Sequence, residues 1–144
     1  MSLLVLPAIA QLNPPVPKPI IGARHPALSP DGKNLAFVYR GDIWGVTPKG
    51  GRATPLTNHL ELDAYPMFSP DGKWLASSGY HEVLVWEVAT GRLARRITNV
   101  GQRVFDIDFH PSGRSLIVAA GRPGHYGELK HFQVIDGKLI HHLM

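Results

Sequence analysis

One short motif occurs three times in this chain at an almost constant interval. Ser29-Pro30-Asp31-Gly32 returns 40 residues later as Ser69-Pro70-Asp71-Gly72, and 41 residues after that as His110-Pro111-Ser112-Gly113. Each copy is followed by Lys or Arg, one variable residue and Leu. Proline presets a turn dihedral, Asp or Ser accepts backbone hydrogen bonds, and glycine adopts a positive φ without strain. The motif therefore predicts three tight turns, each within an equivalent structural unit.

Each unit contains four short apolar runs separated by turn signals. Gly50-Gly51, Thr90-Gly91 and Asp136-Gly137 separate the third run from the fourth, as is typical of hairpins. A repeat of about 40 residues with four strands has the period of a β-propeller blade. The sequence thus predicts an all-β chain, a β-propeller with three four-stranded antiparallel blades. The predicted strands are residues 24–28, 34–40, 42–47 and 52–57, then 64–68, 74–79, 82–88 and 92–98, then 104–109, 115–120, 128–134 and 138–143.

The repeat also divides the chain into segments. Residues 1–21 form an apolar and proline-rich N-terminal segment, followed by blade 1 (22–62), blade 2 (63–103) and blade 3 (104–144). Residues 3–10 have the apolar run and small-residue ending of a clipped signal peptide, although no basic residue precedes them. This favours a periplasmic or extracellular location and leaves a cytoplasmic one open.

The strings of the repeats resemble those of known propeller repeats. Phe68-Ser-Pro-Asp-Gly-Lys-Trp-Leu-Ala76 resembles repeats of the WD-repeat and TolB-type β-propeller class. Residues 50–57 look more TolB-like, whereas residues 83–91 and 129–137 look more WD-like. The Trp-Asp dipeptide of WD repeats is replaced by Trp44-Gly45, Trp86-Glu87 and Phe132-Gln133. The buried polar network of that family is therefore not carried over, although Ser77 or Ser78 is expected to retain a remnant of it with Trp86.

Three blades are too few to close a propeller ring, which takes roughly four to eight. Three resolutions follow. The chain is a segment of a larger propeller protein, or two copies pair as a homodimer with three blades each. Alternatively, the segment from Leu3 to Ile9 covers an open edge.

The resemblance implies that binding residues lie in the loops between second and third strands and in the loops between blades, around a central channel. We expect residues 121–127 to form the longest of these loops. Three histidines on one face could bind a metal or an anion, but equivalent loops of successive blades lie well apart, so no metal site is predicted. The predicted binding residues are His59, Tyr80, His81, Arg103, Arg122, His125 and Tyr126.

The residues that usually carry catalysis are missing or have structural explanations. The chain has no cysteine, and its serines lack the context of a catalytic nucleophile. Asp31 and Asp71 are explained as turn residues, and Asp106 and Asp108 flank a strand whose Phe105, Ile107 and Phe109 should point inward. No glycine-rich phosphate loop is present. We therefore predict no catalytic residue and no cofactor.

The formal net charge of +4 invites a nucleic-acid interpretation. The basic residues are scattered, however, with one local cluster at Arg92, Arg95 and Arg96, and no nucleic-acid motif accompanies them. No stretch is long enough to span a bilayer. The sequence predicts a non-catalytic scaffold that binds a protein or peptide through its loop face. The alternatives are an accessory domain of a larger peptidase or cytochrome-fused enzyme, or a propeller that binds a small ligand or a metal.

Overall fold

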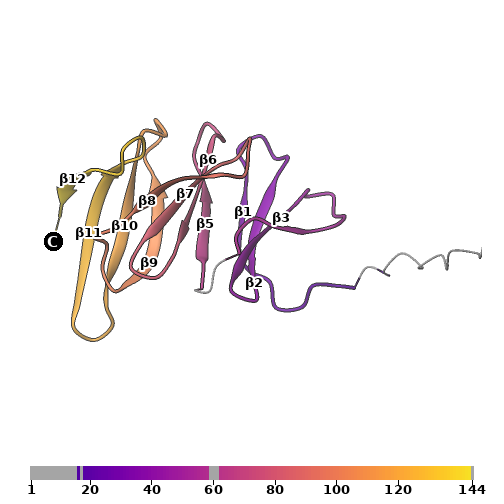
Figure 1. Cartoon of the computed structure of the whole chain (residues 1–144), viewed down its shortest axis with the longest axis horizontal. Helices are drawn as coiled ribbons and strands as arrows, with labels where there is room; N and C mark the ends of the chain where they lie inside the picture. The colour runs from indigo at the N-terminus through magenta and orange to yellow at the C-terminus, as the bar shows by residue number, and fades with distance from the viewer. Residues whose placement is uncertain (1–15, 17, 59–61, 144) are drawn as a thin grey trace, which may run out of the picture.

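The described part of the chain folds into three antiparallel sheets of four strands each, in sequence order (Figure 1). The computed structural model describes residue 16 and residues 18–58 and 62–143. The predicted signal remnant and edge-covering segment lie outside the described residues. The strands are β1 (Arg24–Leu28), β2 (Leu35–Tyr39), β3 (Asp42–Val46) and β4 (Thr54–Pro55), then β5 (Ala64–Phe68), β6 (Trp74–Ser78), β7 (Val83–Glu87) and β8 (Leu93–Ile97), then β9 (Arg103–Phe109), β10 (Ser115–Arg122), β11 (Tyr126–Gln133) and β12 (Leu139–His142). The predicted all-β fold with four-stranded blades is confirmed.

The sheets stand next to one another through their first strands. β5 of the middle sheet contacts both β1 and β9, and Figure 1 shows the three sheets following one another across the molecule. This is how propeller blades pack around an axis, with the first strand of each blade innermost. The loops joining first to second strands therefore lie at one end of the sheets, and those joining second to third strands lie at the other.

The middle sheet is buried on both faces because adjacent residues of a strand point to opposite sides. Leu75, Leu84 and Trp86 form one core cluster with Ala36 and Ile43 of the first sheet. The alternate residues face the third sheet and form a second, larger cluster, which includes Ala76, Val83, Val85, Ile97, Ile107, Phe109, Leu116, Val118 and Phe132. Two apolar layers thus hold the three sheets together.

The repeated turns close by the hydrogen bonds that their residue types predict. The Ser69 hydroxyl donates to Asp71 Oδ1 at 2.6 Å and accepts the Trp74 N–H at 3.0 Å, while Asp71 Oδ1 also accepts the Lys73 N–H. Ser29 and Asp31 form the same arrangement in the first sheet. Asp31 and Asp71 are thus turn residues, as predicted.

Trp86 keeps a remnant of the WD-type polar network. Its indole N–H donates to the Ser77 hydroxyl at 3.1 Å in a buried setting. Of the two serines expected from the sequence, Ser77 is the partner on the facing strand, whereas the Ser78 hydroxyl donates to the Ala64 carbonyl.

Two details of the third sheet differ from the sequence prediction. Residues 121–127 do not form a long loop, because β10 and β11 continue in register to the pair Arg122 and Tyr126. A β-bulge in β9 also shifts its alternation, so that Val104 is buried and Phe105 is exposed. The predicted inward position of Phe105 is therefore wrong, since a bulge adds one residue and changes which face its neighbours take.

Candidate functional site: a cleft at the loop end

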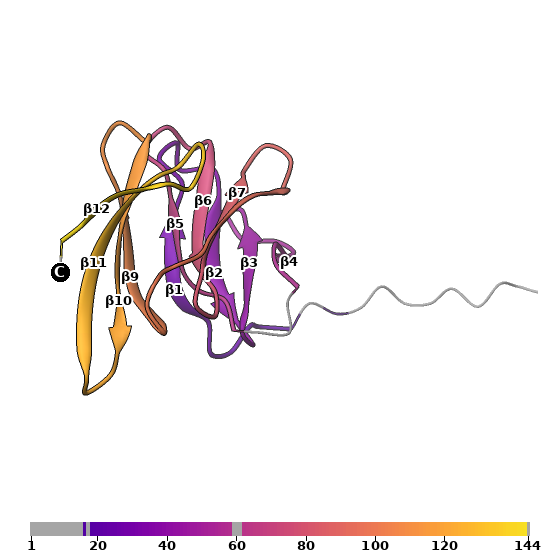
Figure 2. The ribbon, with the colours of Figure 1, turned by 60° about the vertical axis from the view of Figure 1, so that its left-hand side comes forward.

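The loops between second and third strands and the loops between sheets surround one large cleft of about 1070 Å³. We call it the loop-face cleft. It lies at the end of the sheets opposite the Ser-Pro-Asp-Gly turns, where the β10–β11 hairpin extends beyond the other sheets (Figure 2). Its lining draws on all three sheets and the loop between the second and third: Arg24, His25, Val38 and Arg40 from the first sheet and its loops, Asp63, Tyr65, Ser78 and Tyr80 from the second sheet and its loops, Gln102 from the inter-sheet loop, and Arg103, Val104 and Arg122 from the third sheet.

A repeated β-bulge places aromatic rings on the wall of the cleft. The pairing of β1 with β2 shifts between Arg24 and Ala27, and that of β5 with β6 shifts between Ala64 and Met67. His25 and Tyr65 occupy the bulges, each with a φ of 49°. Such a left-handed conformation is uncommon for residues with a side chain and is concentrated at functional sites. The two rings lie 4.5 Å apart between centroids and form a continuous aromatic surface.

Four arginines converge on the cleft from the two outer blades. Arg24 begins β1 and Arg40 occupies the β2–β3 turn, whereas Arg103 begins β9 and Arg122 ends β10. Arg40 has a φ of 53°, and its guanidinium carbon lies 5.3 Å from the centroid of the Tyr39 ring. None of the four pairs with a carboxylate of the described residues, whose ion pairs involve Arg96, Lys130, Lys138 and His142.

The loops around the cleft are fixed by hydrogen bonds between blades and loops. The N–H of Asp63, a residue with 2% exposure, donates to the Gly41 carbonyl at 2.7 Å and so ties the first inter-blade loop to the β2–β3 turn. The buried Lys130 ammonium donates to the Asn99 carbonyl at 2.6 Å and pairs with Glu128 at 3.0 Å. This anchors the second inter-blade loop immediately before Arg103.

The residues predicted from the sequence are distributed unevenly around this cleft. Tyr80, Arg103 and Arg122 line it, and His81 lies next to it with its ring 4.1 Å from that of Tyr80. His125 and Tyr126 sit at the tip of the β10–β11 hairpin and are absent from the lining. The seventh, His59, lies outside the described residues.

The sequence reasoning missed Arg24, His25, Arg40 and Tyr65. A usable signal was present, because His25, Tyr65 and Phe105 are spaced by 40 residues and hold the same place in successive units. Aligning the three units position by position would have shown a recurrent aromatic residue. The missed arginines lacked such a signal.

Metal binding finds no support in the geometry of the described residues. No group of three His, Cys, Asp or Glu side chains comes together among them in a way that could hold an ion. His142 contacts Glu128 at 3.1 Å, and the neighbouring His141 ring lies 5.9 Å from that of His131, so the adjacent pair points to opposite faces. In the same part of the chain there is no helix with the length and hydropathy needed to cross a membrane.

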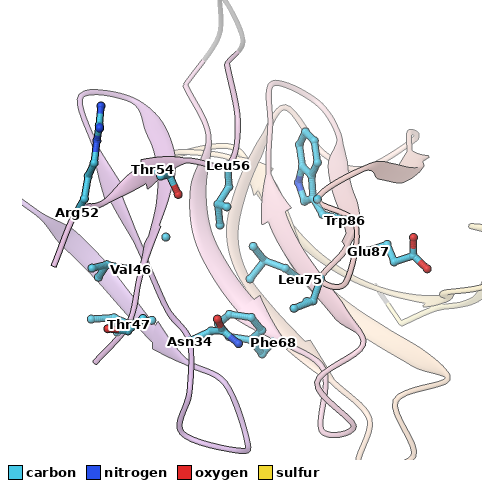
Figure 3. Close-up of a pocket in the computed structure, with 14 residues that line it drawn as sticks. Asn34, Val46, Thr47, Arg52, Thr54, Leu56, Phe68, Leu75, Trp86 and Glu87 are labelled. Carbon is cyan, nitrogen blue, oxygen red and sulfur yellow. The ribbon is translucent and has the colours of Figure 1, made fainter. Parts of the chain in front are cut away.

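A second, smaller cavity of about 280 Å³ lies between the first two sheets, near their outer strands (Figure 3). Leu56, Phe68, Leu75 and Trp86 give it apolar walls, with Arg52 and Glu87 at its margin. β4 is two residues long, and the Leu56 side chain packs directly over Gly45, where a Cβ atom would lie 3.2 Å from the Leu56 methyl carbons. The cavity is explained as a gap where the outer strands of two blades diverge.

Comparison with known proteins supports a propeller. No protein-family model matches the chain. An uncharacterised peptidase of Bacillus subtilis is 28% identical over 113 residues, covering 69% of this chain and 17% of that peptidase. An uncharacterised WD repeat-containing protein of Deinococcus radiodurans is 30% identical over 96 residues, covering 62% of this chain and 32% of its own length. The chain thus spans less than a third of either relative.

Solved structures give the same answer for the fold. A TolB-type protein from Agrobacterium tumefaciens superposes with a TM-score of 0.71 at 19% identity over 86% of this chain and 50% of its own. TolB from Acinetobacter baumannii superposes with a TM-score of 0.65 at 18% identity, over 81% of this chain and 31% of that chain. Hydrazine synthase from Kuenenia stuttgartiensis superposes with a TM-score of 0.74 at 18% identity, over 88% of this chain and 37% of that chain.

The fold defines a class of protein: a β-propeller repeat protein, with a cleft at the loop end of its sheets. Within that class, the three blades have the fold of WD-repeat and TolB-type propellers. The resemblance noted in the sequence is confirmed at this level.

Proposed function

We propose that this chain is a non-catalytic scaffold that binds a protein or peptide through the loop-face cleft. The observation that carries the proposal is the lining of that cleft, which combines aromatic rings and arginines from all three blades. Tyrosine and arginine are the residue types that most often anchor protein interfaces. At about 1070 Å³ the cleft is also large enough to take several side chains of an extended segment.

The non-catalytic part of the proposal depends on what the lining contains. Asp63 is the one acidic residue that lines the cleft within the described part of the chain, and it lies on the buried wall. General acid–base catalysis needs a titratable group within reach of the substrate. Arginine, which remains protonated, does not supply one. His25 is the imidazole of the described lining, and its ring packs against that of Tyr65.

A phage-displayed library of random decapeptides, selected on the purified chain, tests the proposal. Enriched peptides are then synthesised and titrated against the unaltered chain, the variant Tyr80→Ala and the control Tyr126→Ala. Tyr80 is exposed in the cleft, whereas Tyr126 is similarly exposed but lies outside its lining. We expect Tyr80→Ala alone to weaken binding. Failure to enrich any peptide, or equal affinities for all three proteins, would overturn the proposal.

A second candidate is an accessory propeller domain of a larger enzyme. The similarity to the Bacillus subtilis peptidase favours it, because the matched region is 17% of that protein. Sequencing the genomic region around the coding segment tests it. A continuous reading frame that encodes a hydrolase or haem-binding domain would support this candidate, and a frame encoding blades alone would exclude it.

The proposal includes a periplasmic or extracellular location, with a cytoplasmic one as the alternative. The apolar run at residues 3–10 motivates it. Fusing the native coding sequence to a reporter that is active only after export distinguishes the two locations.

A further inference from the structure

We propose that the ligand of the loop-face cleft is an acidic peptide segment, bound through its carboxylates by Arg24, Arg40, Arg103 and Arg122. This inference rests on the proposed function and specifies the chemistry of its partner. Four permanently charged groups line the cleft, against one buried carboxylate among its described residues. The cleft therefore carries an excess of positive charge that a complementary ligand would neutralise.

The arginines form two pairs on either side of the middle blade. Arg24 pairs with Val38 across β1 and β2, two residues before Arg40. On the third blade, Arg103 pairs with Gly121, the neighbour of Arg122. The four guanidinium groups thus come from two separate strand pairs, and Tyr65 and Tyr80 of the middle blade line the same cleft. This arrangement suits a ligand with carboxylates on both sides of a central segment.

The guanidinium groups are available for such a ligand. All four arginines are exposed, and none forms an ion pair with a carboxylate of the described residues. A guanidinium group presents a planar fork of donors that matches the two oxygens of a carboxylate. A single exposed ion pair contributes little. Four arginines in one concave site act together on the same ligand. Their combined attraction should give an affinity for acidic peptides that falls as the salt concentration rises.

A backbone feature adds an independent argument for a ligand. His25, Tyr65 and Arg40 all adopt left-handed conformations at the cleft, where residues with side chains pay a conformational cost. The two bulges bring the His25 and Tyr65 rings together on the cleft wall, with their planes tilted by 51°. Neither ring belongs to a core cluster, so the pair is exposed to a ligand in the cleft that it lines.

An acidic peptide fits these observations better than a nucleic acid. Nucleic-acid binding takes a basic stripe or groove that follows the phosphate backbone. Here the four arginines are gathered in one concave site, and the neighbouring Arg96 is paired with Glu82. An extended peptide can enter such a site and place alternate side chains on its two walls.

Fluorescence anisotropy with four labelled probes tests the inference. The probes are decapeptides of alternating glycine with Glu, Lys or Ser, and an oligodeoxythymidylate with the charge of the Glu peptide. The Glu peptide is expected to bind at least about tenfold more tightly than the Ser peptide, and to weaken between about 50 and 200 mM salt. The Lys peptide should not bind.

Variants with matched controls locate the binding. The double variants Arg24→Gln with Arg40→Gln, and Arg103→Gln with Arg122→Gln, should each lower affinity for the Glu peptide by about tenfold or more. Arg114→Gln is the control, because Arg114 is an exposed arginine beside the third turn at the opposite end of the sheets. Circular dichroism melting confirms that each variant is folded.

The outcomes separate this inference from the proposed function. Binding of the Ser or Lys peptide as tightly as the Glu peptide would overturn the acidic ligand and leave peptide binding intact. Tighter binding of the oligonucleotide would overturn it in favour of a nucleic acid. Loss of affinity in Arg114→Gln equal to that in the cleft variants would overturn the assignment of the site. Failure of every library and synthetic peptide to bind would overturn the proposed function itself.

Discussion

At the residue scale, one hydroxyl or imidazole at the start of each repeated turn organises the whole turn. Ser29 and Ser69 each bridge an Asp side chain and a backbone N–H five residues ahead. In the third copy, His110 Nδ1 accepts the Ser112 N–H and contacts the Ser112 hydroxyl. The Ser hydroxyl also stabilises the charged form of its Asp partner. It is the main reason that the pKa values of Asp31 and Asp71 lie below the ordinary value for aspartate.

The variant Ser69→Ala tests this role. The Ser69 side chain is fully buried, so the change removes two hydrogen bonds and leaves the Trp74 N–H without that acceptor. We expect a loss of about 1–3 kcal/mol in the free energy of unfolding, measured by urea denaturation. The pKa of the Asp71 carboxyl, followed by NMR titration, should rise toward its ordinary value.

The lowered pKa of the Asp71 carboxyl also determines how the stability of the fold changes with pH. Because the pKa of the Asp71 carboxyl is lower in the folded chain than in the unfolded chain, its ionised form stabilises the fold. This contribution is fully present above the pKa of the unfolded chain, about 4, and is lost as the pH falls through the lower pKa of the folded chain. Ser69→Ala should therefore flatten the loss of stability on acidification. The control is Thr98→Ala, an exposed site outside the turns. Equal unfolding midpoints for the two variants, with no change in the Asp71 titration, would contradict the assignment.

At the scale of elements, the placement of the third sheet's arginines depends on a close backbone approach. Gly101 of the second inter-blade loop packs against Gly121 of β10. A Cβ atom on Gly101 would lie 2.5 Å from the Gly121 nitrogen and 2.9 Å from Glu128 Oε1. Arg122 directly follows Gly121, and Arg103 lies two residues after Gly101. The contact therefore couples the inter-blade loop to the β10–β11 hairpin.

The variant Gly101→Ala is expected to push the loop away from β10. The nearest obstructing atom, the Gly121 nitrogen, belongs to the backbone and cannot move aside as the Glu128 side chain can. Overpacking of this kind typically costs about 1–3 kcal/mol. Affinity for the alternating Glu–Gly peptide should fall together with the melting temperature. Gly127→Ala is the matched control, since Gly127 pairs with Gly121 in the same hairpin and a Cβ there would meet nothing within 4 Å. A Gly101→Ala protein with unchanged stability and affinity would refute the coupling.

The same hairpin shows how far the sequence could predict the elements and the site. Turn chemistry and alternation located all twelve strands of the described residues, because each motif acts within a few neighbouring residues. The prediction of a long loop at residues 121–127 is wrong. The glycines and the proline there favour a loop, but β10 and β11 stay paired as far as Arg122 and Tyr126. A pairing between strands depends on contacts that no local pattern contains.

The candidate site was predicted in part for the same reason. Loop positions identified Tyr80, Arg103 and Arg122, which line the cleft, but they also suggested His125 and Tyr126, which do not. His25 precedes a proline within a predicted strand and is not among the predicted binding residues. The bulge that turns it toward the cleft arises from the register between β1 and β2, which single-sequence patterns do not reveal.

At the scale of the whole molecule, the two outer sheets each have one face that the described residues leave partly exposed. The middle sheet is buried on both sides, whereas β10 buries Leu116 and Val118 and leaves Ile117, on the opposite face, exposed. Phe105 and Leu129 are also exposed on the third sheet, and Leu28 on the first. Such apolar faces on blades mark contact surfaces, because unpaired sheet faces and edges favour association. In a propeller each of these faces would pack against a further blade.

We expect the purified chain of 144 residues to self-associate through these faces, and sedimentation velocity over a range of concentrations measures it. Ile117→Lys should shift the distribution toward monomer, because burying an unpaired ammonium against an apolar face is costly. Ile135→Lys is the control, since Ile135 is equally apolar and 67% exposed but lies between β11 and β12, outside the strands of that face. If the chain sediments as a monomer at every concentration, or if both variants behave alike, the uncovered faces do not mediate association between copies, and the three-plus-three arrangement is excluded.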